Sequence, residues 1–345
     1  MAFVDLYSDT QTRPTDGMRA AMAAAEVGDE QRWEDPTVIA LEERVAELLG
    51  QEAAVFLPSG TMCNEIAIRL HIRPGGDEMF LGAQAHPLVA EAGGPAFLSG
   101  AVMTVVEGDA GRFTAEALDE AVTARPVGGR YAPRPRLVSV EQTTNLAGGR
   151  VWPHAQVEAV LTVASAHGLR SHLDGARLMN AVVASGVPAD DFAEGFDTAW
   201  IDFTKGLGAP VGACLAGSEE LIAEAWRYKQ MLGGAMRQSG IIAAAGLYAL
   251  ERHVERLADD HERAARLAAG LAELELVELD PSTVETNIVV FGVPDAPAFC
   301  AAMEREGVRV GPLDARRVRA VTHLDVDDAG IERALEAARS VAARV

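Results

Sequence analysis

The sequence predicts an α/β fold with a largely parallel sheet, followed by a small α+β domain. Short apolar runs, which are typical of buried strands, alternate with Ala-rich stretches of helical periodicity through most of the chain. Such alternation produces right-handed βαβ units and a mostly parallel sheet. Beyond Pro281 the pattern changes to short strands with two helices. We therefore expect a large domain over residues 1–255 and a small C-terminal domain over residues 256–345.

The composition limits the possible partners. The chain has 345 residues, 49% of them hydrophobic and 23% charged, as in ordinary globular proteins. Its formal net charge of −21 argues against nucleic acids and anionic membranes as partners. Three scattered cysteines, Cys63, Cys214 and Cys300, are too few for a disulfide framework or a zinc site. Because the chain opens on no secretion signal and contains no run long enough to span a membrane, we expect a cytoplasmic protein that binds no metal.

The first segment of the chain is ambiguous. Residues 5–15 are polar and lack periodicity, so they form either a disordered tail or an arm that lies over a site and supplies Ser8 as a hydroxyl donor. A short helix is expected from Met18 to about Val27, with Asp16 as its N-cap. Asp35 is expected to cap the next helix, which Gly50 ends.

The later elements follow from the same patterns. We expect strands over residues 53–57, 78–81, 102–106, 137–140 and 211–215, and in the runs that end at Asp174 and before Lys205. We expect helices over residues 60–71, 115–122, 156–166 and 219–230, and a long helical stretch from the Gly-rich turn at residues 233–238 to about Leu274. Gly246 and Gly270 weaken the expected continuity of that stretch. In the small domain we expect strands over residues 286–291, 308–310 and 317–323, and helices over residues 298–305 and 331–343. Residues 130–136 are expected to form a loop.

Polar residues with chemical potential follow several of these strands. Ser59-Gly60-Thr61 separates a strand from a helix, a geometry that suits an anion, although it also suits a plain N-cap. Lys205 follows an apolar run and precedes a Gly-rich break, so it is either a desolvated nucleophilic amine or a solvated loop residue. Asp174 ends another run, and ligands bind at the carboxyl ends of such strands. Pyridoxal phosphate needs a lysine and a carboxylate on its pyridine nitrogen, but Asp174 and Lys205 could equally form a plain ion pair. His86 lies at the same end of the sheet.

These motifs together resemble the low-specificity L-threonine aldolases, which are fold-type-I (aspartate-aminotransferase-like) pyridoxal-phosphate enzymes. The resemblance comes in family order along nearly the whole chain. It rests on Ser8-Asp9-Thr10, Glu34-Asp35-Pro36-Thr37, Pro58 to Met62, His172 to Arg177, Lys205 to Pro210, Gly233 to Gln238 and Arg319 to His323.

The resemblance implies a role for each matching residue. Lys205 would bind the cofactor as a Schiff base, Asp174 would hold its ring nitrogen, and His86 would stack on the ring. The phosphate would lie on Gly60 and Thr61. The resemblance also assigns Arg177, Thr204 and Arg237 to the cofactor, and Ser8, Arg177 and Arg319 to the substrate carboxylate. Lys229 and Arg237 match positions that reach the site from a neighbouring subunit, so a homodimer or homotetramer with sites at the interface is expected.

The implied reaction is retro-aldol cleavage of L-threonine, L-allo-threonine or a related β-hydroxy amino acid to glycine and an aldehyde. The sequence departs from the family pattern in three places, and the changes at Thr144 and Arg32-Trp33 keep a β-eliminating lyase or transaminase open as an alternative. Thr144 replaces a histidine that handles the substrate's β-hydroxyl, and threonine cannot act as a base near neutral pH. Arg32-Trp33 replaces Tyr-Gly, and Tyr7 replaces an arginine. A protein that only holds the cofactor is a third hypothesis, which the retention of Lys205 and Asp174 disfavours.

Overall fold

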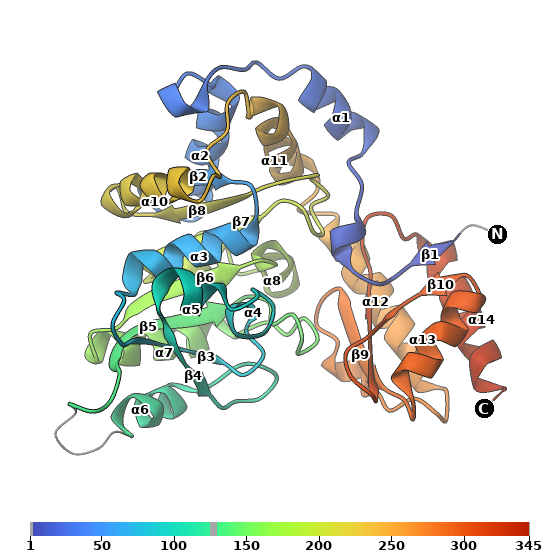
Figure 1. Cartoon of the computed structure of the whole chain (residues 1–345). Helices are drawn as coiled ribbons and strands as arrows, with labels where there is room; N and C mark the ends of the chain where they lie inside the picture. Colours follow the sequence, from blue (N-terminus) through green and yellow to red (C-terminus); the bar gives the residue numbers. More distant parts are fainter. Residues whose placement is uncertain (1–2, 125–129, 345) are drawn as a thin grey trace.

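The computed structural model describes residues 3–124 and 130–344 and is built around a seven-stranded sheet (Figure 1). The strand order is β2-β8-β7-β6-β5-β3-β4. The strands are β2 (Ala53–Leu57), β3 (Asp77–Gly82), β4 (Val102–Val106), β5 (Arg134–Glu141), β6 (Arg170–Gly175), β7 (Thr198–Asp202) and β8 (Ala213–Gly217). Only β8 runs antiparallel to its neighbours among these strands. The other six therefore present their carboxyl ends at one edge, as expected for an α/β fold.

The direction of β8 follows from the length of its connection. Only the ten residues 203–212 separate β7 from β8. A parallel connection needs a crossover of a dozen or more residues, usually a helix. The short Gly-rich loop after Lys205 therefore forces the chain to turn back beside β7.

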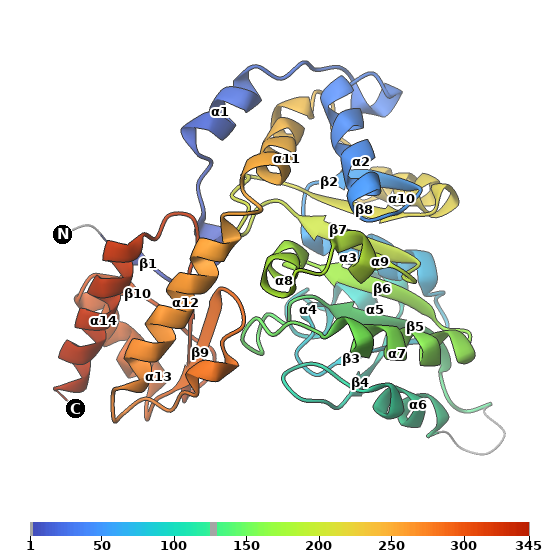
Figure 2. The same ribbon diagram turned by 180° about the vertical axis from the view of Figure 1, so that it is seen from behind.

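Helices cover both faces of the sheet (Figures 1 and 2). Alternate residues of one strand enter different cores: Phe56 packs with the helices of one face, and Val55 and Leu57 pack with those of the other. One face carries α3 (Gly60–His71), α4 (His86–Val89), α5 (Gly94–Ser99) and α10 (Glu219–Met231). The other carries α2 (Pro36–Leu48), α6 (Ala115–Thr123), α7 (His154–Ala166), α8 (Leu178–Ser185), α9 (Ala189–Ala193) and α11 (Gly240–Arg252).

A second core forms around the C-terminal elements. It includes β9 (Ile288–Gly292), β11 (Gly311–Pro312), β12 (Arg317–Val321), α12 (Leu257–Ala272), α13 (Ala296–Arg305) and α14 (Asp328–Ala342). The N-terminal arm joins this core, because β1 (Val4–Asp5) pairs in parallel with β10 (Val308–Arg309) and Leu6 is fully buried there. The predicted division near residue 255 stays a prediction.

The arm is therefore ordered and is not a disordered tail. After β1 it forms a single 3-10 turn, η1 (Asp9–Gln11), and then α1 (Asp16–Ala23), which packs against α11. Two details of the expected helix were wrong. Thr15, not Asp16, is the N-cap, since its hydroxyl accepts from the Met18 N–H at 3.3 Å, and the helix ends at Ala23.

The expected helix to Leu274 is broken into α11 and α12 between residues 253 and 256. The break is not at either glycine. The helix α11 ends at Arg252, and Nδ1 of the next residue, His253, lies 2.7 Å from the carbonyl of Leu207 in the loop after Lys205. Gly246 and Gly270 lie within helices, where a Cβ would press on Leu41 and on Leu335. A tertiary contact with the lysine loop therefore decides where the helix ends.

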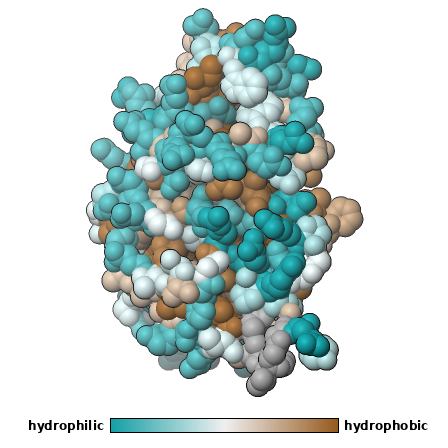
Figure 3. Space-filling view, turned by 90° about the vertical axis from the view of Figure 1, so that its left-hand side faces the viewer, coloured by the Kyte–Doolittle hydropathy of each residue, from teal (hydrophilic) through white to brown (hydrophobic). Residues whose placement is uncertain are grey.

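The start of β5 also differs from expectation. β5 begins at Arg134, inside the expected loop, and its Pro135 lies opposite Glu78, next to the register shift between Glu78 and Met79, the kind of irregularity at which a strand tolerates proline. Two remaining 3-10 turns are η2 (Glu30–Arg32) and η3 (Pro281–Thr283). Helices α5, α8 and α9 had no counterpart in the sequence prediction. The face of the molecule at the left of Figure 1 is mainly hydrophilic (Figure 3), in keeping with the charge of the chain.

Candidate active site

A cavity of about 480 Å³ lies at the carboxyl edge of the sheet. Its walls come from the ends of β2, β5, β6 and β7, from the N-terminal arm and from β12. The residues predicted for the site that line it are Ser8, Gly60, Thr61, His86, Asp174, Arg177, Thr204, Lys205 and Arg319. The topology thus brings together residues from positions 8 to 319.

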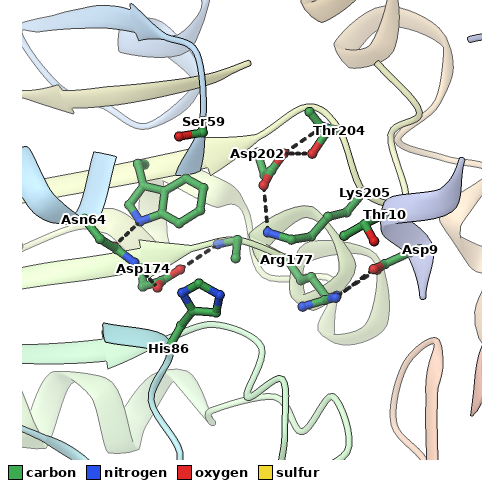
Figure 4. A network of polar contacts seen from close by, with 12 residues as sticks. Asp9, Thr10, Ser59, Asn64, His86, Asp174, Arg177, Asp202, Thr204 and Lys205 are labelled. Carbon is green, nitrogen blue, oxygen red and sulfur yellow. Dashed lines mark hydrogen bonds and ion pairs between the residues drawn. The ribbon is translucent and has the colours of Figure 1, made fainter. Parts of the chain in front are cut away.

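Lys205 lies in the loop after β7, three residues beyond the strand end. Its Nζ is 2.7 Å from Asp202 Oδ2, and its side chain is 18% exposed, which is enough to face the cavity (Figure 4). The other Asp202 oxygen accepts from the backbone N–H and hydroxyl of Thr204. Thr12 fixes the loop from the arm, because its hydroxyl donates to the carbonyl of Thr204 at 2.8 Å and lies 2.9 Å from that of Lys205. The lysine is therefore held in place yet accessible from the cavity.

Asp174 is the penultimate residue of β6 and is 1% exposed. Its Oδ2 accepts from Asn64 Nδ2 at 2.7 Å, and its Oδ1 accepts from the Ala176 N–H at 3.1 Å. Burial raises the pKa of Asp174, while the Asn64 hydrogen bond and the charges of His86 and Lys205 oppose that rise. The carboxylate is thus desolvated on the protein side and fixed in orientation.

His86 is the first residue of α4 and stands beside the same carboxylate. Its Nδ1 lies 2.7 Å from Glu91 Oε1, which also accepts from Asn64 Nδ2 at 2.7 Å. Because the partner is a carboxylate, Nδ1 carries the hydrogen, and Nε2 is the ring nitrogen left for other contacts. A third of the His86 side chain is exposed.

The turn after β2 has the geometry of an anion site. Ser59 caps α3 by accepting from the Met62 N–H at 3.2 Å, and Thr61 is exposed to the cavity. Gly60 fits here for a steric reason, since a Cβ would lie 2.2 Å from the indole of Trp200. The first turn of a helix of 12 residues therefore opens on the cavity, with its free N–H groups and the positive end of its dipole.

Arg177 is held by the arm rather than left free. Its Nε and Nη2 each donate to an Asp9 oxygen at 2.7 Å, and Asp9 also accepts from Asn287 at 3.1 Å. Burial would raise the pKa of Asp9, but the charge and hydrogen bonds of Arg177 hold it well below its usual value. Two of the donor groups that the carboxylate role of Arg177 needs are therefore occupied, and that role stays a prediction.

Arg319 is the second cavity arginine. It projects from β12 and donates to Asn145 Oδ1 at 2.8 Å. In contrast to Arg177, it forms no ion pair with an acid of the described residues. Ser8 lies nearby on the arm, where its hydroxyl accepts from both the backbone and the side chain of Thr10.

Two predicted residues lie away from this cavity. Arg237 is exposed and pairs with Asp29 at 2.9 Å, so it reaches no cofactor in its own chain. Lys229 was expected to reach a neighbouring subunit, and this was wrong. Its side chain is completely buried, with Nζ 2.9 Å from Glu30 Oε1. The resemblance identified the position of Lys229 in the sequence, but in the structure its side chain packs into the core of its own chain.

The departures from the family pattern also have definite positions. The Thr144 hydroxyl accepts from the Arg150 N–H at 3.2 Å and does not line the cavity. Trp33 is 64% exposed and packs on Trp226 with ring centroids 5.4 Å apart. Tyr7 lies under the Arg309 guanidinium. None of the three lines the cavity.

Sequence reasoning missed four residues that shape the site: Asp9, Asn64, Glu141 and Asp202. Asp202 could have been found as the last residue of the strand before Lys205. Asn64 lies one helical turn after Gly60, which would have placed it on the cavity side of α3. Burial and the charge of Asp174 raise the pKa of Glu141 to about 8.

These residues fit pyridoxal phosphate. The cavity offers an accessible amine on Lys205, a buried carboxylate on Asp174 and the free first turn of α3, which match the aldehyde, ring nitrogen and phosphate of that cofactor. The described residues offer no comparable set of metal ligands: no three His, Cys, Asp or Glu side chains in residues 3–124 and 130–344 come close enough to hold an ion. No helix of the described residues is long and apolar enough to cross a membrane.

Comparisons with known proteins agree with the geometry. A family model described as beta-eliminating lyase matches residues 5–293. The probable low-specificity L-threonine aldolase 2 of Arabidopsis thaliana is 41% identical over 338 residues, covering 96% of this chain and 95% of the relative. The low specificity L-threonine aldolase of Escherichia coli K12 is 41% identical over 326 residues, 94% of each chain. In fold, the chain is similar to the threonine aldolase of Leishmania major, with a TM-score of 0.84, 19% identity and coverage of 98% and 99%.

Proposed function

Because the chain belongs to the beta-eliminating lyase family and, within it, to the low-specificity L-threonine aldolases, we propose that it cleaves L-threonine and L-allo-threonine to glycine and acetaldehyde with pyridoxal phosphate. The observation that carries the proposal is the convergence of Lys205, Asp174 and the first turn of α3 on one cavity. The alternative of β-elimination or transamination is not favoured, since relatives at 38–41% identity are named threonine aldolases.

We assign the residues that hold the cofactor from their positions. The Lys205 amine would bind its aldehyde, Asp174 would hold a proton on the ring nitrogen, and Thr61 with the α3 N–H groups would bind the phosphate. When bound, the cofactor supplies an electron-accepting ring next to the amine of the substrate. Desolvation of Asp174 strengthens its interaction with a protonated ring nitrogen.

Arg319 is the group best placed for the substrate carboxylate. It faces the cavity, carries guanidinium donors beyond the one that Asn145 uses, and lies within an otherwise acidic protein. Ser8 adds a hydroxyl from the arm. Arg177, which spends two donor groups on Asp9, would act mainly by fixing the arm and with it Ser8. Fixing the carboxylate sets the orientation of the bond that breaks.

A base must take the proton of the β-hydroxyl, and Thr144 is excluded because its hydroxyl is bound to Arg150 outside the cavity. We assign this proton transfer to His86, either directly or through a water. Glu91 holds Nδ1 and leaves Nε2 to receive the proton. The charge of Glu91 stabilises the imidazolium that would result.

The test is a product assay on the pyridoxal-phosphate-loaded enzyme with L-threonine and L-allo-threonine supplied separately. We expect glycine and acetaldehyde in equal amounts, with both absent in Lys205→Ala. Release of ammonia with a keto acid, or transfer of the amino group to an added keto acid, would instead establish the alternative chemistry.

We also propose a homodimer or homotetramer, in which the exposed Arg237 reaches the cavity of a neighbouring subunit. The exposed, apolar Met231 and Leu232 beside it support a protein contact at this surface. Mixing Lys205→Ala with Arg237→Ala protein and finding restored activity would support shared sites; sedimentation as a monomer would refute them. A cytoplasmic location is supported by Cys63, Cys214 and Cys300, all of which are buried and unpaired.

A further inference from the structure

Asn64 is the most completely hydrogen-bonded side chain at the cavity, although the reaction proposed above does not use it. It lies on α3 and is 1% exposed. Its Oδ1 accepts from Trp200 Nε1 at 2.8 Å and is 3.1 Å from His172 Nε2. Its Nδ2 donates to Asp174 Oδ2 and to Glu91 Oε1, each at 2.7 Å. Both ends of the amide are therefore engaged, and Figure 4 shows Asn64 beside Asp174.

The contact with Trp200 fixes the orientation of this amide. An indole N–H can only donate, so the atom facing it must be the amide oxygen. The amide NH2 must then face Asp174 and Glu91. Because the same oxygen faces His172 Nε2, that nitrogen must carry a hydrogen.

The orientation of the Asn64 amide also fixes which atom donates and which accepts in the hydrogen bonds that link His172, Thr198 and His71. Burial lowers the pKa of His172 to about 3, so the ring is neutral and its Nδ1 is an acceptor. Nδ1 therefore accepts from the Thr198 hydroxyl at 2.9 Å. The Thr198 oxygen, having donated its hydrogen, accepts from His71 Nε2 at 3.1 Å. Burial likewise lowers the pKa of His71, to about 4.

The result is a polar chain in which every hydrogen points the same way: from His71 to Thr198, His172, Asn64 and finally Asp174. All four residues before Asp174 are buried, with exposures between 0% and 4%. Hydrogen bonds aligned in this way polarise one another, and the effect is larger in a low-dielectric interior. The positive end of the chain lies on the Asp174 carboxylate.

Asp174 needs such support because some features of its surroundings raise its pKa and others lower it. Burial and the charge of Glu91 raise its pKa, and Glu141 is a further acid close to it. The His86 and Lys205 charges act in the opposite direction. A neutral donor on the protein side favours the charged carboxylate without the repulsion that a cation there would exert on a protonated ring nitrogen.

We propose that Asn64, oriented by the buried chain from His71, is a positioning residue that keeps Asp174 ionised and aimed at the ring nitrogen of the cofactor. This inference rests on the proposed function in so far as it assumes pyridoxal phosphate. The series of hydrogen bonds from His71 to Asp174 exists in the protein without cofactor. The proposed function and this inference can therefore fail separately.

The first test is NMR of cofactor-free protein labelled with 15N-histidine. Long-range proton–nitrogen spectra distinguish the two neutral tautomers, and His172→Gln and His71→Gln identify the two signals among the eight histidines. We expect both rings to be neutral with hydrogen on Nε2 at pH 6. A hydrogen on Nδ1 of His172, or a doubly protonated ring at that pH, would reverse or break the chain and overturn the proposal.

The second test interrupts the series of hydrogen bonds at a residue that lies away from the cavity. Thr198→Val removes one hydroxyl while nearly keeping the volume, and Thr198→Ser keeps the hydroxyl. Thr143→Val is the matched control, because the Thr143 hydroxyl is also buried but contacts no hydrogen-bond partner among the described residues. The readouts are the Kd of pyridoxal phosphate and the pH dependence of its absorbance in the bound state.

For Thr198→Val we expect about 3- to 10-fold weaker cofactor binding, the loss of one hydrogen bond's contribution, with a shifted absorbance profile. Asn64→Asp replaces the donor by an acid facing Asp174, and we expect binding about 10- to 100-fold weaker. Thr198→Ser should behave as the wild type and Thr143→Val should change nothing. If Thr198→Val matches Thr143→Val in both readouts, the chain does not act on Asp174. Absence of glycine in the product assay, with these shifts present, would refute the proposed reaction and leave this inference standing.

Discussion

The two lysines of the sequence, Lys205 and Lys229, lie in regions of opposite character. Lys205 stands on a loop, contacts one carboxylate and keeps 18% of its side chain exposed to a cavity. Lys229 is on α10 with no exposed side-chain surface, paired with Glu30 and lying 4.6 Å from the ring centroid of Trp226. An ion pair forms in both regions. The difference is access, and it separates an amine that can react from one that only supports the fold.

The supports of the two regions differ in kind as well. The Lys205 loop is fixed by backbone contacts from Thr12 and by Asp202, none of which closes the cavity. Around Lys229, Glu30 also accepts from the backbone N–H of Met236 and from the Ser239 hydroxyl, so the pair ties the turn at residues 233–239 to the core. Removing each lysine should therefore damage a different property.

The largest expected effect is on activity, in Lys205→Ala. We expect kcat/KM to fall by about 10³-fold or more, because the proposed role of Lys205 is to bind the cofactor covalently, with little change in the free energy of unfolding. Borohydride treatment of the loaded wild type followed by peptide mass spectrometry should label Lys205 alone. A label on Lys229 would contradict the difference in access.

The second effect is on stability, in Lys229→Met. Because the change leaves Glu30 charged and unpaired in the interior, we expect the free energy of unfolding to fall by about 3–5 kcal/mol. Urea unfolding of cofactor-free protein measures it. The double variant with Glu30→Gln should recover part of the loss. A loss below about 1 kcal/mol would show that the pair is not structural.

The third effect concerns pH and the acid beside Lys229. Burial, partly opposed by the hydrogen bond from the Phe56 N–H, raises the pKa of Glu42 from 4.5 to about 7. Between these two values the folded state holds a proton that the unfolded state has lost, so stability falls as pH rises from 4.5 to 7 and is constant above. Glu42→Gln should unfold at the wild-type free energy at pH 4.5 but be more stable by about 1–2 kcal/mol at pH 7.5, since Glu42 is only half-buried. Equal pH profiles for the two proteins would rule out the raised pKa.

The smallest expected effect is that of Arg237→Ala on stability, because Arg237 belongs to an exposed ion pair. We expect a change below about 1 kcal/mol in the free energy of unfolding, similar to Arg44→Ala at the exposed Arg44–Glu47 pair. Titration with pyridoxal phosphate separates the two variants. If cofactor binding is weakened in Arg237→Ala and not in Arg44→Ala, Arg237 contributes to cofactor binding across a subunit interface. Equal cofactor binding in the two variants would rule out that role.

Much of the fold follows from local patterns. The capping of α2 by Asp35, with Pro36 at its first position, was predicted from residue type and is confirmed by the side-chain contacts to Thr37 and Val38. The central strands were found because apolar runs and turn residues are short-range signals. The end of α11 was missed because a contact between distant residues, Leu207 and His253, lies there.

The residues of the candidate site also fall into those that local patterns predict and those that they do not. Lys205 and Asp174 could be predicted to share a cavity because both follow strands of one parallel sheet. Asp9 could not, since nothing in its sequence neighbourhood signals that Arg177 lies against it, 168 residues away. The spacing of Asn64 after Gly60 could have placed it on the cavity side of α3, but residue type alone does not reveal what it contacts there. Its importance arises from Trp200 and His172, which only folding brings to it.

The parallel pairing of β1 with β10 has a consequence for the order of assembly during translation. Val4 finds its partner only at Val308, about 300 residues later, and at about 5–20 residues per second the ribosome needs roughly 15–60 s to make that length. Until then the arm has no strand to join, and Asp9 lacks Asn287. The large sheet can form meanwhile, with its open edge facing solvent. The cavity, whose lining includes Arg319, can therefore be completed only near the end of synthesis, and a ribosome that stalls within that interval leaves a sheet without a finished site.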